Sequence, residues 1–95
     1  MEGSTEKEEK LARAISAGSR REILRLLVDQ ELTVKEIAKE TRLSVSLASR
    51  HLQLLSDLGF LLTRKEGIYR HYSLKMKEIK ELLTCYDKVL RKYDA

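Results

Sequence analysis

The chain has 95 residues and carries 19 lysines and arginines against 15 aspartates and glutamates, a formal net charge of +4. This length makes one domain, residues 1–95, which buries only part of its surface, so a partner subunit would add stability. The positive balance permits a polyanionic partner. A single cysteine excludes a disulfide within the chain, and no apolar run approaches the ~18 residues that span a bilayer. We therefore expect a soluble, intracellular, cytoplasmic protein.

The first part of the chain predicts two helices. Residues 1–5 are expected to fray, and apolar residues then share one face of a helix over about residues 6–17. Ser19 and Glu22 have the spacing of a capping box, in which the two side chains satisfy free amides at a helix start. This box predicts a second helix over about residues 20–29, with its apolar side chains turned toward a core.

The next segment predicts a short strand followed by a helix. Thr33 and Glu36 form a second capping box, which opens a helix that ends near Thr41. Leu32, just before the box, is expected to form a strand of minimal length.

A fourth helix is predicted from its N-cap Ser44 to Leu58, where Gly59 ends it. At about 100° per residue this helix has two contrasting sides. The side expected to face the core carries Leu47, Ala48, His51, Leu54, Leu55 and Leu58, with Leu52 at its edge. The free side carries Val45, Ser46, Ser49, Arg50 and Gln53.

The free side of this helix has side chains suited to reading DNA. Its serines are short enough for close approach to base edges and phosphates, and Ser44 joins them at the helix start. Arg50 can fork onto the two major-groove acceptors of guanine, and Gln53 can pair with adenine or reach a phosphate. A solvated face of an ordinary amphipathic helix is the alternative interpretation. The surrounding helix-turn-helix and hairpin favour DNA binding.

Residues 60–64 and 68–74 predict the two strands of a hairpin, with residues 65–67 as its turn. Three basic side chains cluster here: Arg64, Lys65 and Arg70. They could blunt the exposed edges of the strands or contact the DNA backbone or minor groove. Acidic partners are scarce in the hairpin itself, which favours phosphate contact.

The last helix, over about residues 75–93, has an unbroken apolar stripe at three- and four-residue spacing. Cys85 lies at the margin of this stripe. A buried free cysteine is one interpretation. A disulfide to the same residue of a partner subunit is another, since two-fold contacts bring identical patches together. Redox sensing is a third.

The run from Glu31 to Leu74 resembles the ArsR-type winged helix-turn-helix repressors, and the resemblance extends over about residues 11–90. The match is carried by SRHL-x-x-L at Ser49–Leu55, LGF-L at Leu58–Leu61 and KEG-x-Y-x-x-Y-x-L at Lys65–Leu74. It implies a mainly α fold with a small β-hairpin wing, comprising a core and wing (6–74) and a C-terminal dimerisation helix (75–95).

The same resemblance implies a homodimeric transcriptional repressor whose two recognition helices enter successive major grooves of a near-palindromic operator. MarR-type regulators are a related alternative. A winged helix that serves only as a protein-interaction module is another, although a hydrophobic or acidic face would suit it better. An enzyme is not expected, because the chain offers no activated nucleophile, paired carboxylates or glycine-rich phosphate loop.

Many ArsR-type proteins sense metals, but the ligand positions differ in this chain. Thr33 and Lys35 stand where the family's thiol site has cysteines, and the last helix has carboxylates but no histidine. Soft and borderline metals need thiolate or imidazole ligands. His51 is expected to make a structural hydrogen bond, and His71 is distant in sequence from a second ligand. We therefore expect no metal and no other cofactor.

Overall fold

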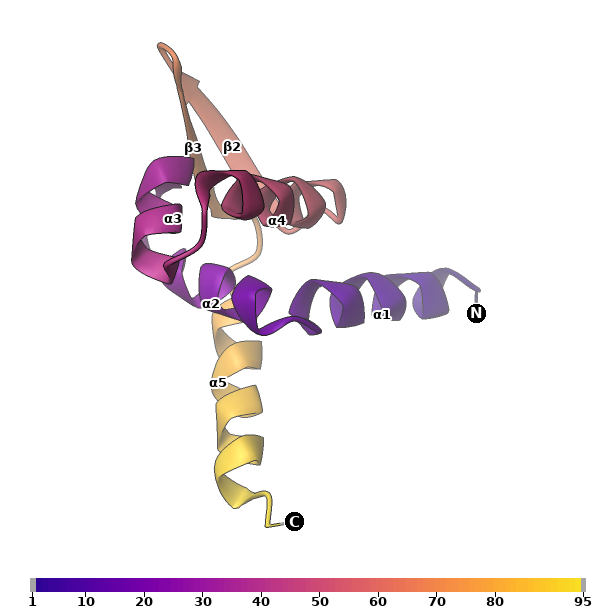
Figure 1. Cartoon of the computed structure of the whole chain (residues 1–95). Coiled ribbons are helices and arrows are strands. Elements are labelled where there is room, and N and C mark those ends of the chain that lie inside the picture. Colours follow the sequence, from indigo (N-terminus) through magenta and orange to yellow (C-terminus); the bar gives the residue numbers. More distant parts are fainter. Residues whose placement is uncertain (1, 95) are drawn as a thin grey trace.

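The computed structural model describes residues 2–94 and contains five helices around a three-stranded antiparallel sheet (Figure 1). The elements in chain order are α1 (Glu2–Ile15), α2 (Gly18–Leu26), β1 (Leu32–Thr33), α3 (Val34–Thr41), α4 (Val45–Asp57), β2 (Leu61–Glu66), β3 (Tyr69–Leu74) and α5 (Glu78–Lys92). In this part of the chain, no helix combines the length and apolar character that a membrane span requires.

The N-terminal helices differ from the prediction at their starts. Helix α1 already begins at Glu2, so the expected fraying of residues 2–5 is wrong, while Met1 lies outside the described residues. Helix α2 begins at Gly18 after Ala17, which makes no side-chain cap hydrogen bond, so the capping box predicted at Ser19 does not form. Helix α2 also ends at Leu26, three residues earlier than expected.

Arginines take the place of that serine cap. The Arg20 Nη2 atom donates to the Arg13 carbonyl at 2.8 Å, and the Arg21 Nη1 atom donates to the Ile15 carbonyl at 2.6 Å. Both bonds go to carbonyls in the last turn of α1, where cationic donors are favoured. The α1–α2 connection is therefore held from the α1 side, and α2 can begin one residue before Ser19.

The local signals of the helix-turn-helix are confirmed. The Thr33 hydroxyl accepts from the Glu36 amide at 3.3 Å, and the Glu36 carboxylate accepts from the Thr33 amide at 2.8 Å, which completes the capping box. The Ser44 Oγ atom accepts from the Leu47 amide at 3.0 Å and starts α4. Gly59, at φ +90°, follows the C-cap of α4 in a conformation that favours glycine.

The sheet has the strand order β1-β3-β2, and the predicted strand stub at Leu32 pairs with Tyr72. The wing hairpin, residues 61–74, has a shorter turn than the sequence suggested. Lys65 pairs with Arg70 in the ladder, and the turn is formed by residues 67–68 instead of 65–67. Gly67, at φ +61°, makes such a tight turn accessible.

The core lies between α2, α3, α4 and the base of the hairpin. Its largest fully buried side chains are Ile23, Leu24, Leu27, Ile37, Leu52 and Leu55. In α4 the buried stripe is Ala48, Leu52 and Leu55, at the i, i+4, i+7 spacing of a helix face. Leu52 is thus central, not at the edge as predicted, and Leu47 is wrong as a core residue, because it lies at the flank and is 36% exposed.

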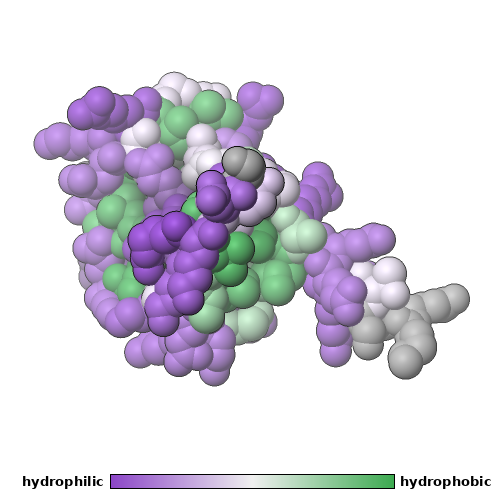
Figure 2. Space-filling view, turned by 90° about the horizontal axis from the view of Figure 1, so that it is seen from below, coloured by the Kyte–Doolittle hydropathy of each residue, from purple (hydrophilic) through white to green (hydrophobic). Residues whose placement is uncertain are grey.

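Helix α5 begins at Glu78, not at 75, and it is fastened to α2 by polar contacts. Arg25 pairs with Asp87 at 2.7 Å, and the Arg21 guanidinium lies 5.1 Å from the centre of the Tyr86 ring. Both terminal helices then project from the body in different directions (Figure 1). Figure 2 shows hydrophobic surface gathered beside α5, between this helix and α1.

Candidate nucleic-acid interface

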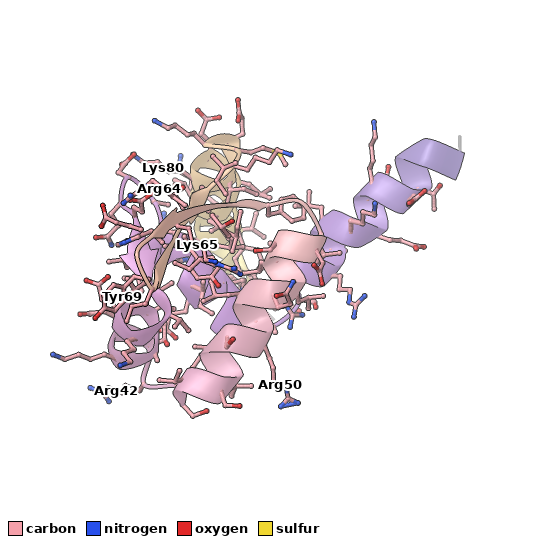
Figure 3. The ribbon with its side chains drawn as sticks, turned by 90° about the horizontal axis from the view of Figure 1, so that it is seen from above. Arg42, Arg50, Arg64, Lys65, Tyr69 and Lys80 are labelled. Atoms are coloured by element: carbon pink, nitrogen blue, oxygen red, sulfur yellow. The ribbon has the colours of Figure 1, made fainter. Side chains whose placement is uncertain are left out.

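The polar side of α4 is exposed. Ser46, Ser49, Arg50 and Gln53 lie on the surface, on the side of the helix away from its buried stripe, and Val45 is exposed at the helix start beside that stripe. Figure 3 shows Arg50 extending away from α4 into open space. Among residues 5–94, whose side chains the structure describes, Arg50 makes no ion pair, so its guanidinium is available to an external acceptor.

Two of the predicted contact residues already have partners. The Ser44 hydroxyl is engaged as the N-cap of α4. The Gln53 Nε2 atom donates to the Asp57 carboxylate at 2.8 Å, one helical turn further on. A base contact by the Gln53 amide group would therefore compete with this bond, whereas its carbonyl oxygen remains open to a donor.

Arg64 is not the free cation that the sequence suggested. Its Nη2 atom lies 2.6 Å from the Glu31 carboxylate, and its Nη1 atom lies 3.3 Å from the Glu66 carboxylate. The hydrogen bond from Arg64 lowers the pKa of Glu31, and the two carboxylates together raise the pKa of Arg64. The expectation that acidic partners are scarce was wrong, because the sheet brings Glu31, 33 residues away in sequence, beside the hairpin.

The two faces of the wing hairpin have different charges. Arg64 stands opposite His71, and Glu66 stands opposite Tyr69; since side chains alternate along a strand, these residues share one face. On that face the His71 Nε2 atom lies 3.5 Å from Glu66 without forming a hydrogen bond. This face is largely neutralised by its own ion pairs.

The opposite face carries Lys65 directly across from Arg70. Both side chains are exposed, and neither forms an ion pair with any residue in the described part of the chain. Like charges directly opposite each other in a ladder repel. An external anion between or beside them would relieve this repulsion, so the pair is suited to a phosphate.

Arg42 is a candidate that the sequence analysis missed. It follows α3 in the turn before α4 and adopts φ +60°, the left-handed conformation usually taken by glycine or asparagine at a helix end. Figure 3 shows Arg42 and Arg50 on either side of the N-terminal part of α4. A basic residue between a predicted helix end and the serine cap of the next helix was the signal that could have identified it.

His51 has the structural role expected for it. The His51 side chain is half-buried on the inner side of α4, and its Nδ1 atom lies 3.5 Å from the Arg20 guanidinium. Burial lowers the pKa of His51, and the charges of Arg20 and Arg50 lower it further. A neutral imidazole can accept from Arg20 at this position, which joins α4 to the α1–α2 connection.

Two positions considered for metal binding are engaged in other contacts, whereas Cys85, considered for a disulfide, is free. No group of three or more histidine, cysteine or acidic side chains is arranged to hold a metal ion among the described side chains, residues 5–94. Thr33 is engaged in the capping box, and Asp87 is paired with Arg25. Cys85 is a free, exposed thiol, so the interpretation of a buried cysteine is wrong for the single chain.

A capped helix-turn-helix followed by an antiparallel hairpin, with the hairpin rising beside the second helix, defines a winged helix-turn-helix protein (Figure 1). Residues 18–62 match the sequence model of the bacterial regulatory protein, arsR family. The transcriptional activator HlyU of Vibrio cholerae is 36% identical over 83 residues, spanning 87% of this chain and 77% of that protein. A cadmium resistance transcriptional regulatory protein, the CadC homolog of Staphylococcus aureus, is 37% identical over 78% of this chain and 62% of its own length.

Solved structures agree with this relationship. HlyU from Vibrio cholerae N16961 superimposes with a TM-score of 0.82 at 34% identity, covering 94% of this chain and 97% of that one. The homodimeric winged helix-turn-helix DNA-binding domain of Mb0332 from Mycobacterium bovis gives a TM-score of 0.84 at 26% identity, covering 98% and 86%. The chain belongs to the ArsR family of winged helix-turn-helix transcriptional regulators, which are DNA-binding proteins and not enzymes.

Proposed function

We propose that this protein is a homodimer that recognises a near-palindromic DNA operator by sequence and represses transcription by occupying a promoter, without a metal ion. One observation carries the proposal: α4 exposes Arg50 and the hairpin that rises beside α4 exposes Lys65 and Arg70 on one face, and none of the three forms an ion pair with another described residue (Figure 1). The helix supplies groups that discriminate base edges, and the hairpin supplies charges that fix register on the backbone.

Dimerisation is supported by the terminal helices. The outer half of α5 exposes Val89 and Leu90, and its C-cap residue Tyr93 is 71% exposed, although α5 is amphipathic. Hydrophobic surface continues from α5 toward α1 (Figure 2). A contiguous apolar surface of this kind on a small domain marks an interaction site. A second copy placed about a two-fold axis would cover it and would set two α4 helices for successive major grooves.

The dimer also bears on Cys85. This exposed thiol lies on α5 within one turn of Leu82 and Val89, so pairing of α5 with its symmetry mate would bring the two thiols toward each other. Non-reducing gel electrophoresis of the wild-type protein and a Cys85→Ser variant tests for an intersubunit disulfide. A dimer band in the wild-type lane alone supports the disulfide, and monomer in both lanes refutes it.

Metal-independent binding is supported by the donor set, because no histidine or cysteine accompanies the carboxylates of α5 other than the single Cys85. DNA binding by the purified protein should therefore be unchanged by a chelator and by added Zn²⁺ or Cd²⁺. Loss of binding on addition of either metal would show that the protein responds to metals.

Selection of bound sequences from a random duplex library tests the main proposal. The expected product is a two-fold symmetric motif with half-sites about one helical turn apart. An Arg50→Ala variant should lose discrimination at one base pair of each half-site, by about 1–3 kcal/mol. Leu62→Ala, at an exposed site on the neutralised face of the hairpin, is the matched control and should keep full discrimination. Recovery of unselected sequences would instead indicate a protein-interaction module.

A further inference from the structure

Val45, the first residue of α4, is an exposed apolar side chain beside the polar face of the helix. It is 47% exposed, although its spacing to Ala48 and Leu52, three and seven residues further on, aligns it with the edge of the buried stripe. A β-branched residue also lowers helix propensity slightly, so helix propensity does not favour a valine with this much exposed apolar surface. The cap bond from the Leu47 amide to Ser44 fixes the backbone of the first turn and thus the position of Val45.

The surroundings of Val45 narrow what it can contact. Its exposed neighbours on α4 are Ser46, Ser49 and Arg50, which carry hydrogen-bonding groups suited to base edges and phosphates. The edges of the base pairs in the major groove present donors, acceptors and one apolar group, the C5-methyl of thymine. If the valine packed on a donor or acceptor of a base, that polar group would lose its hydrogen bond to water and gain none in return, which is costly.

We propose that Val45 is a specificity-determining residue that packs on the C5-methyl group of a thymine in each operator half-site. The inference rests on the proposed function, since it requires α4 to enter the major groove. Arg50 stands five residues further along the helix, a rise of about 7.5 Å, or about two base-pair steps. The half-site therefore contains a thymine for Val45 close to the guanine that Arg50 reads.

Deoxyuridine provides a chemical test, because it differs from thymidine only by the absence of this methyl group. Each thymine of the selected operator is replaced in turn by deoxyuridine, and affinity is measured by fluorescence anisotropy. For the wild-type protein, one position per half-site should weaken binding about fourfold, the equivalent of one buried methylene group. The symmetric double replacement should weaken binding about fifteenfold.

The Val45→Ala variant should bind the thymine and deoxyuridine operators equally well, because the partner of the methyl group is gone. Leu62→Ala removes a side chain of similar exposure, 51%, from the hairpin and should keep the full deoxyuridine effect. Equal affinity of the wild-type protein for every deoxyuridine duplex would overturn the inference, and so would a fourfold effect that persists in Val45→Ala. Either result leaves the proposed function intact, whereas an absence of sequence-selective binding overturns both.

Discussion

Replacing Lys65 with alanine is expected to flatten the salt dependence of DNA binding, whereas replacing Arg64 is not. The two residues are neighbours in β2, but they lie on opposite faces of the hairpin. Arg64 is neutralised by Glu31 and Glu66, so it has no uncompensated charge to offer a phosphate. Lys65 has no acidic partner within the described residues and faces another cation, Arg70.

The size of the effect follows from counterion release. Each phosphate neutralised contributes about 0.9 to the slope of log affinity against log salt concentration. A dimer contains two copies of Lys65, so Lys65→Ala should reduce the magnitude of the slope by about 1.8. When the salt concentration rises fourfold, the affinity of the wild type should therefore fall about twelvefold more than the affinity of Lys65→Ala. Arg70→Ala should give a similar value, and both variants should affect operator and random duplex alike.

Anisotropy titrations of operator and random duplex at several salt concentrations measure the slope directly. Arg64→Ala is the matched control at the adjacent position: its slope should equal that of the wild type, while its thermal midpoint should fall because Glu31 and Glu66 lose their partner. If Arg64→Ala lowered the slope as much as Lys65→Ala, Arg64 would be exchanging its carboxylates for phosphates. The assignment of the two hairpin faces would then be incorrect.

Three further predictions concern stability and assembly. Gly59→Ala should lower the free energy of unfolding by about 1–2 kcal/mol, measured by urea denaturation, because φ +90° strains any residue with a Cβ atom. Bonds from Thr33 lower the pKa of Glu36, so its contribution to stability is present above pH 4.5 and is lost as the pH falls through the lower folded-state value. Glu36→Gln should remove that part of the acid dependence of the thermal midpoint; an unchanged profile would contradict the linkage. Leu90→Asp should yield monomers in analytical ultracentrifugation, whereas Leu62→Asp, at a similarly exposed site, should remain dimeric.

The features predicted correctly from the sequence depend on groups close together in the chain. The capping box of Thr33 and Glu36, the cap at Ser44 and the stop at Gly59 each involve residues at most three positions apart. Their geometry follows from the backbone of a helix end, which is the same in any fold. The winged helix-turn-helix and its exposed reading face follow from such local signals and from the family resemblance.

The sequence-based predictions fail where residues distant in the chain form the hydrogen bonds or ion pairs. Ser19 has a correct capping-box spacing, but Arg20 and Arg21 already hold the α1–α2 connection through the carbonyls of α1. The sequence analysis also missed the acidic partner of Arg64, because Glu31 is remote in sequence and becomes a neighbour only through the pairing of β1 with β3; a DNA contact by Arg64 stays a prediction. Neither the periodicity nor the composition of the sequence predicts this strand register.

The same register gives the hairpin a fixed position before DNA arrives. Glu31 immediately precedes β1, and β1 leads directly into α3, so the Arg64–Glu31 pair joins β2 to the start of the helix-turn-helix. Since side chains alternate along a strand, Lys65 and Arg70 lie on the hairpin face opposite this pair. Phosphate contacts by Lys65 and Arg70 would then set the register in which Val45 and Arg50 meet the base edges. In the proposed mode of binding, Arg64 would support sequence reading without touching DNA, because its pair with Glu31 holds the wing from which the register is set.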